Sequence, residues 1–399
     1  MYDVLIIGAG PAGLAAAIEM KELDENINIL IVDEYLQAGG RLIGQLYQEK
    51  DGHWWNGVEE SDSLIKEIEN HHITMKLGTS VYDIEQNNHW IVFTNNGVFE
   101  AEKLLICTGA QETTNPVEGW TLPGVMTVGA AQVLTNVHMI KPGKKGIIVG
   151  VNVLSSAIAM ELAMAGVKVD AMVLPNNLNI NKKEAIPEIV FKNLLSVAHM
   201  APSLIAKLGS KFLFTESLKK LGAKFYPRKG IKMWDIPILM KTAVKKIEGD
   251  TEVEKVTLVD LYTNGKEVPN SERVVEVDFV CLSEGLAPLT ELISLTGCSF
   301  YYIEELSGYI PLHNEYMETE VKNLYVAGNV TGIEGAKIAM KQGEVAAHTI
   351  ISSLSKNTNT NINKKLQEVE DARNNAAIQF HPEINEGRKK VQQLWEETV

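Results

Sequence analysis

Three glycines near the N-terminus have the spacing of a pyrophosphate-binding turn. Gly8, Gly10 and Gly13 follow an apolar strand directly and open a helix-prone stretch. In such a turn the first glycine permits the tight bend, the second lets the backbone approach phosphates, and the third lets the helix pack on the strand. The helix N-terminus directs its partial positive charge at the phosphates. This turn, with Pro11 and Ala12 in it, therefore predicts the binding of a dinucleotide.

An acidic residue stands where the ribose of a dinucleotide is expected. A second apolar strand ends at Asp33, 20 residues after Gly13. A carboxylate at this distance accepts a hydrogen bond from a ribose hydroxyl. Glu34 is the alternative if the strand register differs by one residue. Because strand, glycine turn, helix, second strand and acid occur in order, a dinucleotide site is favoured over a merely glycine-rich turn.

Two further glycine segments indicate that the dinucleotide is FAD. Gly39 and Gly40 follow the acid and allow a second close approach of the backbone. Near the C-terminal end, "LYVAGNVTGIEGAKIAM" is another strand, turn and helix, in which Gly328, Asn329 and Gly335 would meet the ribityl chain and the flavin. A helix N-terminus there favours electron density on the ring. The alternative is an ordinary closing strand–helix unit.

The middle of the chain carries a similar turn with side chains in place of glycines. In "GIIVGVNVLSSA" Gly150 is kept, but Asn152 and Ser155 occupy the other two glycine positions. Asn152 adds a side chain where a pyrophosphate needs bare backbone. The next strand ends in Leu174-Pro175-Asn176, without a carboxylate for a ribose or an arginine for a 2′-phosphate. We therefore expect that NAD(P)H is not the obligatory reductant, although loose binding of an adenine nucleotide stays open.

These elements imply an α/β fold with one domain inserted into another. Residues 1–115 and 277–350 are expected to form a split FAD-binding, Rossmann-like domain, with a second Rossmann-like domain at 116–276. Residues 351–399 are expected to be a helical tail. Its helically spaced apolar residues would cover the FAD domain, the favoured interpretation, or meet another subunit. They are Ile384, Val391, Leu394 and Trp395.

Composition limits the partners. The 399 residues carry a formal charge of −14, which argues against nucleic acid as a partner. No stretch approaches the roughly 18 uninterrupted apolar residues of a membrane span, and a cytoplasmic location is expected. Cys107, Cys281 and Cys298 are far apart and form no C-x-x-C pair, and the histidines lack metal-ligand spacing, so no metal site is predicted.

Three segments resemble a known group of flavoproteins. "CTGAQETTNPVEGWTLPGVMTVGAAQ", "VCLSEGLAPLTELISLTGC" and "NLYVAGNVTGIEGA" are similar to the alpha subunits of opine oxidase, hydrogen cyanide synthase and dye-linked proline or sarcosine dehydrogenases, which have the glutathione-reductase type of fold. The resemblance covers residues 1 to about 350. It implies FAD contacts along the segments described above, including the strand end Thr108-Gly109. The implied residues are Gly8, Gly10, Gly13, Asp33, Gly39, Gly40, Arg41, Val81 (through its backbone, to adenine), Gly109 and those from Gly328 to Ala336.

The chain departs from this group in three places. Asn329 stands where such proteins often carry aspartate, so it brings no charge. Many relatives continue into a cysteine-rich iron–sulfur domain, but no cysteine follows Cys298, so a cluster would belong to a partner. The third departure is the middle turn at Asn152.

The predicted function is an FAD-dependent oxidoreductase that acts on an amine, imino acid or opine and passes electrons to a partner or acceptor. The resemblance implies a smaller flavoprotein and an iron–sulfur protein as partner subunits. The alternatives are an NAD(P)H-dependent reductase of ferredoxin, quinone or oxygen, and a non-catalytic FAD-binding subunit. No catalytic acid or base is named. Lys337 would either neutralise charge at the flavin or be solvated, and Trp54 and Trp55 would pack against the inserted domain or, less favoured, wall the flavin.

Overall fold

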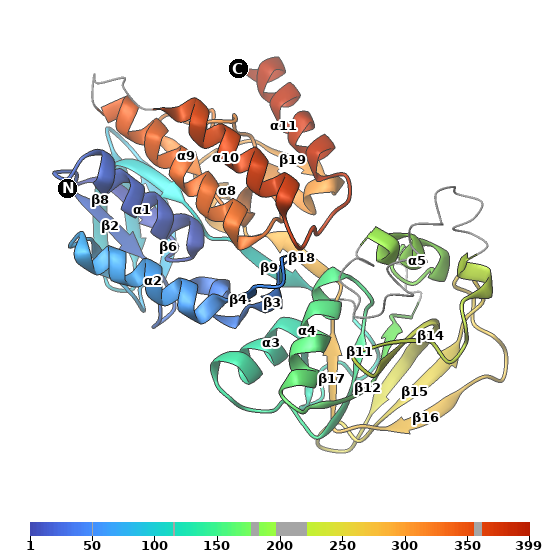
Figure 1. Ribbon diagram of the computed structural model, residues 1–399. Coiled ribbons are helices and arrows are strands. Elements are labelled where there is room, and N and C mark those ends of the chain that lie inside the picture. The colour runs from blue at the N-terminus through green and yellow to red at the C-terminus, as the bar shows by residue number, and fades with distance from the viewer. Residues whose placement is uncertain (50, 115, 177–182, 197–221, 355–360) are drawn as a thin grey trace. The chain divides into compact units, whose positions relative to one another are not determined.

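The chain divides into two compact units, each described by itself. The computed structural model describes residues 1–399 except 50, 115, 177–182, 197–221 and 355–360 (Figure 1). The first unit comprises Met1–Gln111 and Leu286–Val399, and the second comprises Glu112–Gly285. The sequence predicts junctions near 115 and 277 and a separate tail at 351–399, whereas the structure includes that tail in the first unit.

The first unit is built on a seven-stranded sheet in the order β5-β2-β1-β8-β7-β6, with β21 also paired to β8. The strands β5, β2, β1, β8 and β21 pair in parallel, and β6 and β7 pair antiparallel. The central strands are runs of buried aliphatic residues because both faces of the sheet are covered. The strands are β1 (Tyr2–Ile7), β2 (Ile29–Val32), β5 (Thr74–Lys76), β6 (Val81–Gln86), β7 (Trp90–Thr94), β8 (Gly97–Ile106) and β21 (Leu324–Val326).

Two helices from opposite ends of the chain pack together on this sheet. They are α1 (Pro11–Leu23) and α9 (Ala336–Leu354), which lie side by side in Figure 1. Small residues set their close approach: a Cβ added at Gly343 of α9 would lie 2.2 Å from the carbonyl oxygen of Ala12. The glycine turn before α1 is thereby held next to the turn before α9.

The rest of the first unit consists of shorter elements and the C-terminal helices. These are η1 (Gly40–Gly44), β3 (Leu46–Gln48), β4 (Trp54–Asn56), α2 (Gly57–Asn70), β9 (Ala110–Thr113), β18 (Gly285–Pro288), α8 (Glu291–Ser294), β19 (Phe300–Ile303), η4 (Glu304–Leu306), β20 (Gly308–Pro311), η5 (Asn329–Thr331), α10 (Ile362–Asn375) and α11 (Ile384–Thr398). Strands β9 and β18 pair with each other. Glu112 and Thr113 of β9 and Gly285 of β18 already belong to the second unit.

The C-terminal helices cover their own unit. Helix α10 packs on α9, and α11 packs on η4. The predicted apolar stripe supplies Ile384 and Val391, which are buried in one cluster, and Leu394 packs against it. The other buried members of this cluster are Ile303, Leu306 and Ile310.

The second unit has an eight-stranded sheet in the order β10-β17-β11-β12-β14-β15-β16, with β13 beside β14. Strands β10, β17, β11, β12 and β14 pair in parallel, as in a Rossmann-like sheet, and the remaining strands pair antiparallel. Its elements are β10 (Val125–Thr127), α3 (Val128–Gln132), η2 (Val133–Val137), β11 (Lys145–Val149), α4 (Val153–Met164), β12 (Lys168–Leu174), α5 (Pro187–Ser196), β13 (Ile231–Met233), β14 (Ile236–Glu248), β15 (Lys255–Asp260), β16 (Arg273–Glu276) and β17 (Phe279–Leu282). Both units are α/β, as the sequence predicts.

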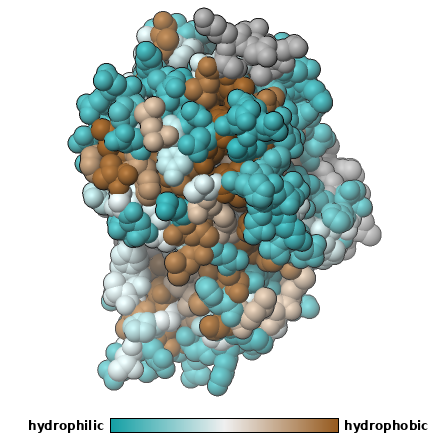
Figure 2. All heavy atoms as spheres, turned by 90° about the vertical axis from the view of Figure 1, so that its left-hand side faces the viewer, coloured by the Kyte–Doolittle hydropathy of each residue, from teal (hydrophilic) through white to brown (hydrophobic). Residues whose placement is uncertain are grey.

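Hydrophobic residues lie among hydrophilic ones on the face shown in Figure 2. Within the described residues, no helix combines the length and the hydropathy that a membrane crossing requires.

Candidate cofactor site

The first glycine turn is a cradle with an open centre. Gly8 has φ +110°, and a Cβ there would lie 2.4 Å from the carbonyl oxygen of Cys107, so only glycine fits. A Cβ at Gly13 would lie 2.0 Å from the carbonyl oxygen of Gly8, which explains how α1 packs onto the turn. A Cβ at Gly10 would meet nothing within 4 Å, and no side chain caps α1. Backbone amides at this helix N-terminus are therefore available to a phosphate.

Asp33 ties the turn to the end of β2. Its carboxylate accepts hydrogen bonds from the backbone N–H groups of Ala9, at 2.6 Å, and Tyr35, at 2.8 Å. A carboxylate has about four acceptor positions, so a ribose hydroxyl can still be accommodated. The neighbouring Glu34 is exposed.

The second glycine pair lies against the first turn. The N–H of Gly39 donates to the carbonyl oxygen of Ala9 at 2.8 Å. A Cβ at Gly40 would lie 3.1 Å from the Cα of Gly10. The structure thus brings together two segments that the sequence predicts to form one site, while the next residue, Arg41, is exposed.

Thr108 and Gly109 lie where β8 ends, beside Gly8. Thr108 Oγ1 donates to the carbonyl oxygen of Leu289 at 2.7 Å. Gly109 has φ +77°, and a Cβ there would meet nothing within 4 Å. Val81, the first residue of β6, is half-buried and belongs to the same sheet.

The C-terminal turn also reaches the first crossover. Gly328 has φ +81°, and a Cβ there would lie 2.9 Å from the Cβ of Ala12, next to Pro11 at the start of α1. Gly335 is open to its surroundings, and Ala336 begins α9. Asn329 Oδ1 accepts from the backbone N–H of Glu334 at 3.1 Å, so its amide shapes the loop.

The aromatic hairpin β3–β4 lies beside the start of α9. Trp55 is buried with Leu42 and Ala336, in the same unit, while Trp54 is partly exposed. Lys337 Nζ lies 2.9 Å from Glu49 Oε1 and 4.7 Å from the centre of the Trp55 ring. The lysine is therefore paired and stacked, and not simply solvated.

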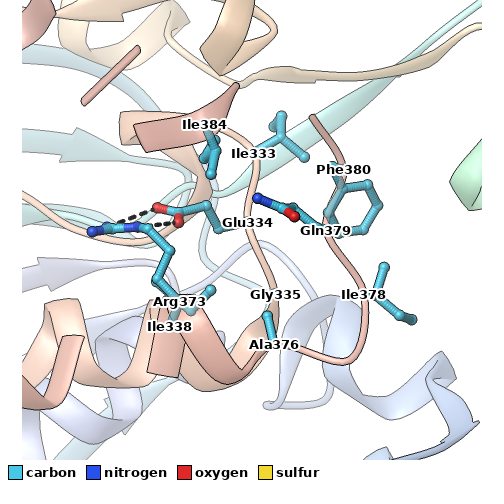
Figure 3. Close-up of a pocket in the computed structure, with 10 residues that line it drawn as sticks. All are labelled: Ile333, Glu334, Gly335, Ile338, Arg373, Ala376, Ile378, Gln379, Phe380 and Ile384. Carbon is cyan, nitrogen blue, oxygen red and sulfur yellow. Dashed lines mark hydrogen bonds and ion pairs between the residues drawn. The ribbon is translucent and has the colours of Figure 1, made fainter. Parts of the chain in front are cut away.

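A buried ion-pair cluster, which sequence reasoning missed, precedes α9. Glu334 contacts Arg373 of α10 and Arg388 of α11 (Figure 3 shows the pair with Arg373). Its pocket is otherwise lined mainly by apolar residues and borders Gly335. The one available signal was a glutamate between Ile333 and Gly335 in a segment expected to meet the flavin, and its partners lie far away in the sequence.

The middle turn of the second unit is closed by its own side chains. Gly150 has φ +110°, the same bend as Gly8. Asn152 Oδ1 accepts from the N–H of Ser155 at 2.9 Å, and Ser155 Oγ accepts from the N–H of Asn152 at 3.0 Å. Asn152 Nδ2 donates to Ser283 Oγ at 3.2 Å. This reciprocal capping box occupies amides that a pyrophosphate uses in an open turn.

The cysteines are not arranged for disulfide chemistry. Cys107, Cys281 and Cys298 are free and buried, and burial raises the pKa of each thiol. A thiol is nucleophilic as the thiolate, which is scarce when the pKa is raised. Among the described residues, no group of three or more His, Cys, Asp and Glu side chains is placed to hold a metal ion.

Comparison with known proteins identifies the family. Residues 2–343 match the family model "Pyridine nucleotide-disulphide oxidoreductase". An opine oxidase subunit of Rhizobium meliloti (strain 1021) is 26% identical over 371 residues, which are 89% of this chain and 72% of that protein. Hydrogen cyanide synthase subunit HcnB of Pseudomonas aeruginosa is 26% identical over 356 residues, 87% of this chain and 70% of that protein. For two further opine oxidase subunits the matched share of the relative is 66% and 63%.

The fold is shared with solved structures. L-proline dehydrogenase from P. horikoshii superposes with a TM-score of 0.66 at 18% identity, covering 93% of this chain and 58% of that one. Thioredoxin reductase from T. acidophilum superposes with a TM-score of 0.61 at 21% identity, covering 89% of this chain and 99% of that one. The chain belongs to the pyridine nucleotide-disulphide oxidoreductase family and is a flavoprotein oxidoreductase whose cofactor is FAD.

Proposed function

We propose that FAD occupies the cradle formed by the two ends of the chain. The open backbone at Gly10 and the uncapped N-terminus of α1 would bind the pyrophosphate, and Asp33 or Glu34 the ribose. The adenine end would lie along β6 near Val81, and the flavin end near Gly335 and Ala336. The fit is supported by the glycine positions that tolerate no side chain or face open space.

We propose further that the chain oxidises a C–H bond next to nitrogen in an amine, imino acid or opine. The chemistry that bound FAD would supply is to accept a hydride from the substrate and to pass the electrons on to an acceptor. The chain's residues bind and orient: amides at the start of α1 hold phosphate, and the paired ammonium of Lys337 lies in the first turn of α9. The names of opine oxidase and L-proline dehydrogenase support this substrate class.

The observation that carries the proposal is the capping box at Asn152. Nicotinamide dinucleotide binding at that turn requires the amides that Asn152 and Ser155 occupy, and displacing these bonds costs about 1 kcal/mol or more each. Two such losses weaken binding by roughly 10-fold to 100-fold or more. The electrons therefore come from another donor.

Stopped-flow reduction of the purified flavoprotein tests this. NADH and NADPH are compared with a panel of N-methyl and cyclic amino acids and opines, under anaerobic conditions, by the loss of flavin absorbance. We expect at least one amine or imino acid to bleach the flavin rapidly and the nicotinamides to bleach it slowly. Rapid bleaching by NADH alone would reverse the assignment.

The second candidate is an NAD(P)H-dependent reductase. It is favoured by the retained bend at Gly150 and by an NADH oxidase of Methanocaldococcus jannaschii that is 23% identical over 371 residues. The Asn152→Gly variant separates the two candidates. If NADH reduces the flavin only after this substitution, the capping box is what excludes the nucleotide.

Partner subunits form part of the proposal. Several relatives are named as subunits, including the alpha subunit of a sarcosine oxidase, which is 28% identical over 182 residues. The expected partners are a smaller flavoprotein and an iron–sulfur protein that receives the electrons. If no donor reduces the flavin even with co-purified partners present, a non-catalytic FAD-binding subunit is the remaining interpretation.

A further inference from the structure

Three charged side chains are buried together immediately before α9. The side chains of Glu334, Arg373 and Arg388 are exposed by 4%, 6% and 13%. Arg373 donates to the Glu334 carboxylate at 2.6 and 3.2 Å, and Arg388 Nε donates to it at 3.0 Å. Burial alone would raise the pKa of Glu334, but the two guanidinium groups lower it below its ordinary value, so this carboxylate is ionised at neutral pH.

The same cluster is hydrogen-bonded to the loop that precedes α9. Arg388 Nη1 donates to the carbonyl oxygen of Thr331 at 2.7 Å. Thr331 Oγ1 donates to the carbonyl oxygen of Gly328 at 2.9 Å, and the N–H of Gly328 donates to Gln342 Oε1 at 2.9 Å. Thr331 and Glu334 of this loop are therefore bonded directly to α11 by hydrogen bonds from a charged group, which are stronger than neutral ones, and Thr331 in turn bonds to Gly328.

The cluster also places a charge beside the proposed flavin position. Glu334 precedes Gly335 directly, and both arginines come from the C-terminal helices α10 and α11. Buried charges are poorly screened by water and salt, so a change of one charge here acts strongly on a neighbouring group. Glu370, which also contacts Arg373, is half-exposed and contributes less.

We propose that the Arg373–Glu334–Arg388 cluster is a positioning and tuning device for FAD: it fixes the 328–335 loop and sets the reduction potential of the bound flavin. This inference rests on the proposed placement of the flavin near Gly335. The three residues act through the loop and through their charge, and they are positioning residues. The C-terminal helices would thus serve the cofactor besides covering the core.

The test measures the midpoint potential of bound FAD in full-length holoprotein, by equilibration with a reference dye. Glu334→Gln removes a negative charge and should raise the potential, because reduction adds negative charge to the flavin. Arg388→Gln removes a positive charge and should lower it. Each shift should be about 30 mV, which is a tenfold change in the relative affinity for reduced and oxidised FAD. The double variant E334Q/R388Q should return towards the wild-type value.

Affinity is the second readout. Arg388→Gln should raise the dissociation constant of FAD at least tenfold in reconstituted apoprotein, because the loop loses its hydrogen bonds from α11. Arg388→Lys keeps the charge and should keep the potential, while its affinity for FAD falls. Lys390→Gln is the matched control: it removes a positive charge from the same helix, but that lysine is half-exposed and pairs with Glu305. It should change neither quantity.

Neither the potential nor the affinity measurement uses a substrate. A failure of this inference can therefore be distinguished from a failure of the proposed oxidation reaction. Shifts of the same sign in E334Q and R388Q, or potentials equal to wild type in both, would overturn the tuning role. If R388Q does not fold, E334Q still decides by the sign and size of its potential shift, and R388K by an unchanged potential with a lowered affinity for FAD. An unchanged potential and affinity in these two variants would leave the cluster as an anchor of the C-terminal helices alone.

Discussion

At the scale of single residues, the two bends at Gly8 and Gly150 show how similar turns diverge. Both glycines have φ +110° and allow the chain to reverse after a central strand. The position two residues later differs: it is bare backbone at Gly10 in one unit and the side chain of Asn152 in the other. One side chain that caps its own helix closes a turn whose backbone amides are otherwise open.

Substitutions at Gly8 and Gly10 should separate folding from cofactor binding. Gly8→Ala should lower the free energy of unfolding by about 2 kcal/mol or more, because the new Cβ clashes with Cys107 and φ is positive. Gly10→Ala should leave stability unchanged, since its Cβ meets open space, but weaken FAD binding about tenfold by blocking the phosphate. Chemical denaturation of apoprotein and FAD titration measure the two effects. Equal stability losses in both variants would contradict this account.

His313 should make the stability pH-dependent. Burial, with the nearby Arg388 charge, lowers the pKa of its imidazole from 6.5 to about 4. Between these values the unfolded chain binds a proton that the folded chain does not, so stability is complete above pH 6.5 and falls as the pH decreases towards 4. The expected loss between pH 7 and pH 5 is about 2 kcal/mol.

Denaturant titrations at the two pH values check this prediction. His313→Gln should remove most of the difference between pH 7 and pH 5. The control His53→Gln changes an exposed imidazole and should keep the wild-type difference. A pH dependence that is identical in H313Q and wild type would show that other groups cause it.

At the scale of elements, the first unit is held together by helices from its two chain segments. Helix α1 packs on α9, and α10 and α11 then add a second set of contacts around the loop before α9. Helix α11 makes two kinds of contact. Its charged residue Arg388 orients the loop before α9 through hydrogen bonds, and its apolar stripe adds buried apolar area to the core.

Ile384→Ala tests the contribution of α11. The side chain is 3% exposed, so the substitution should reduce the free energy of unfolding by about 2–5 kcal/mol through lost burial and a cavity. Gln393→Ala changes an exposed position on the same helix and should have an effect within about 0.5 kcal/mol. Thermal and chemical denaturation provide the measurement. Similar losses in the two variants would mean that α11 does not pack as described.

At the scale of the whole molecule, the chain combines the fold of a disulphide oxidoreductase family with thiols unsuited to disulphide exchange. The three cysteines are buried in both units and have raised pKa values. The native protein should therefore react with fewer than one equivalent of a thiol reagent per chain, and with three equivalents after unfolding. Replacing all three by alanine should leave flavin reduction by the amine substrate unchanged. Loss of that reduction in a folded, FAD-loaded triple variant would contradict the prediction.

The sequence by itself determined the local elements of the proposed cofactor cradle. Glycines at fixed spacing, aliphatic runs and a terminal acid have local conformational causes, so the turn at Gly8, the strand before Asp33 and the α/β class could all be predicted. An obstruction of the middle turn by the Asn152 side chain could also be predicted, because this side chain acts within one turn of helix.

Only the tertiary structure decided which distant residues meet around the start of α9. Arg373 and Arg388 meet Glu334 across separations of 39 and 54 residues, and Lys337 meets Glu49 from the N-terminal part of the chain. Sequence periodicity gives the face of a helix but not its partner, because long-range pairing depends on how the elements pack. A buried charge is tolerated when such packing brings its counter-charges to it, and no local pattern in the sequence specifies that meeting.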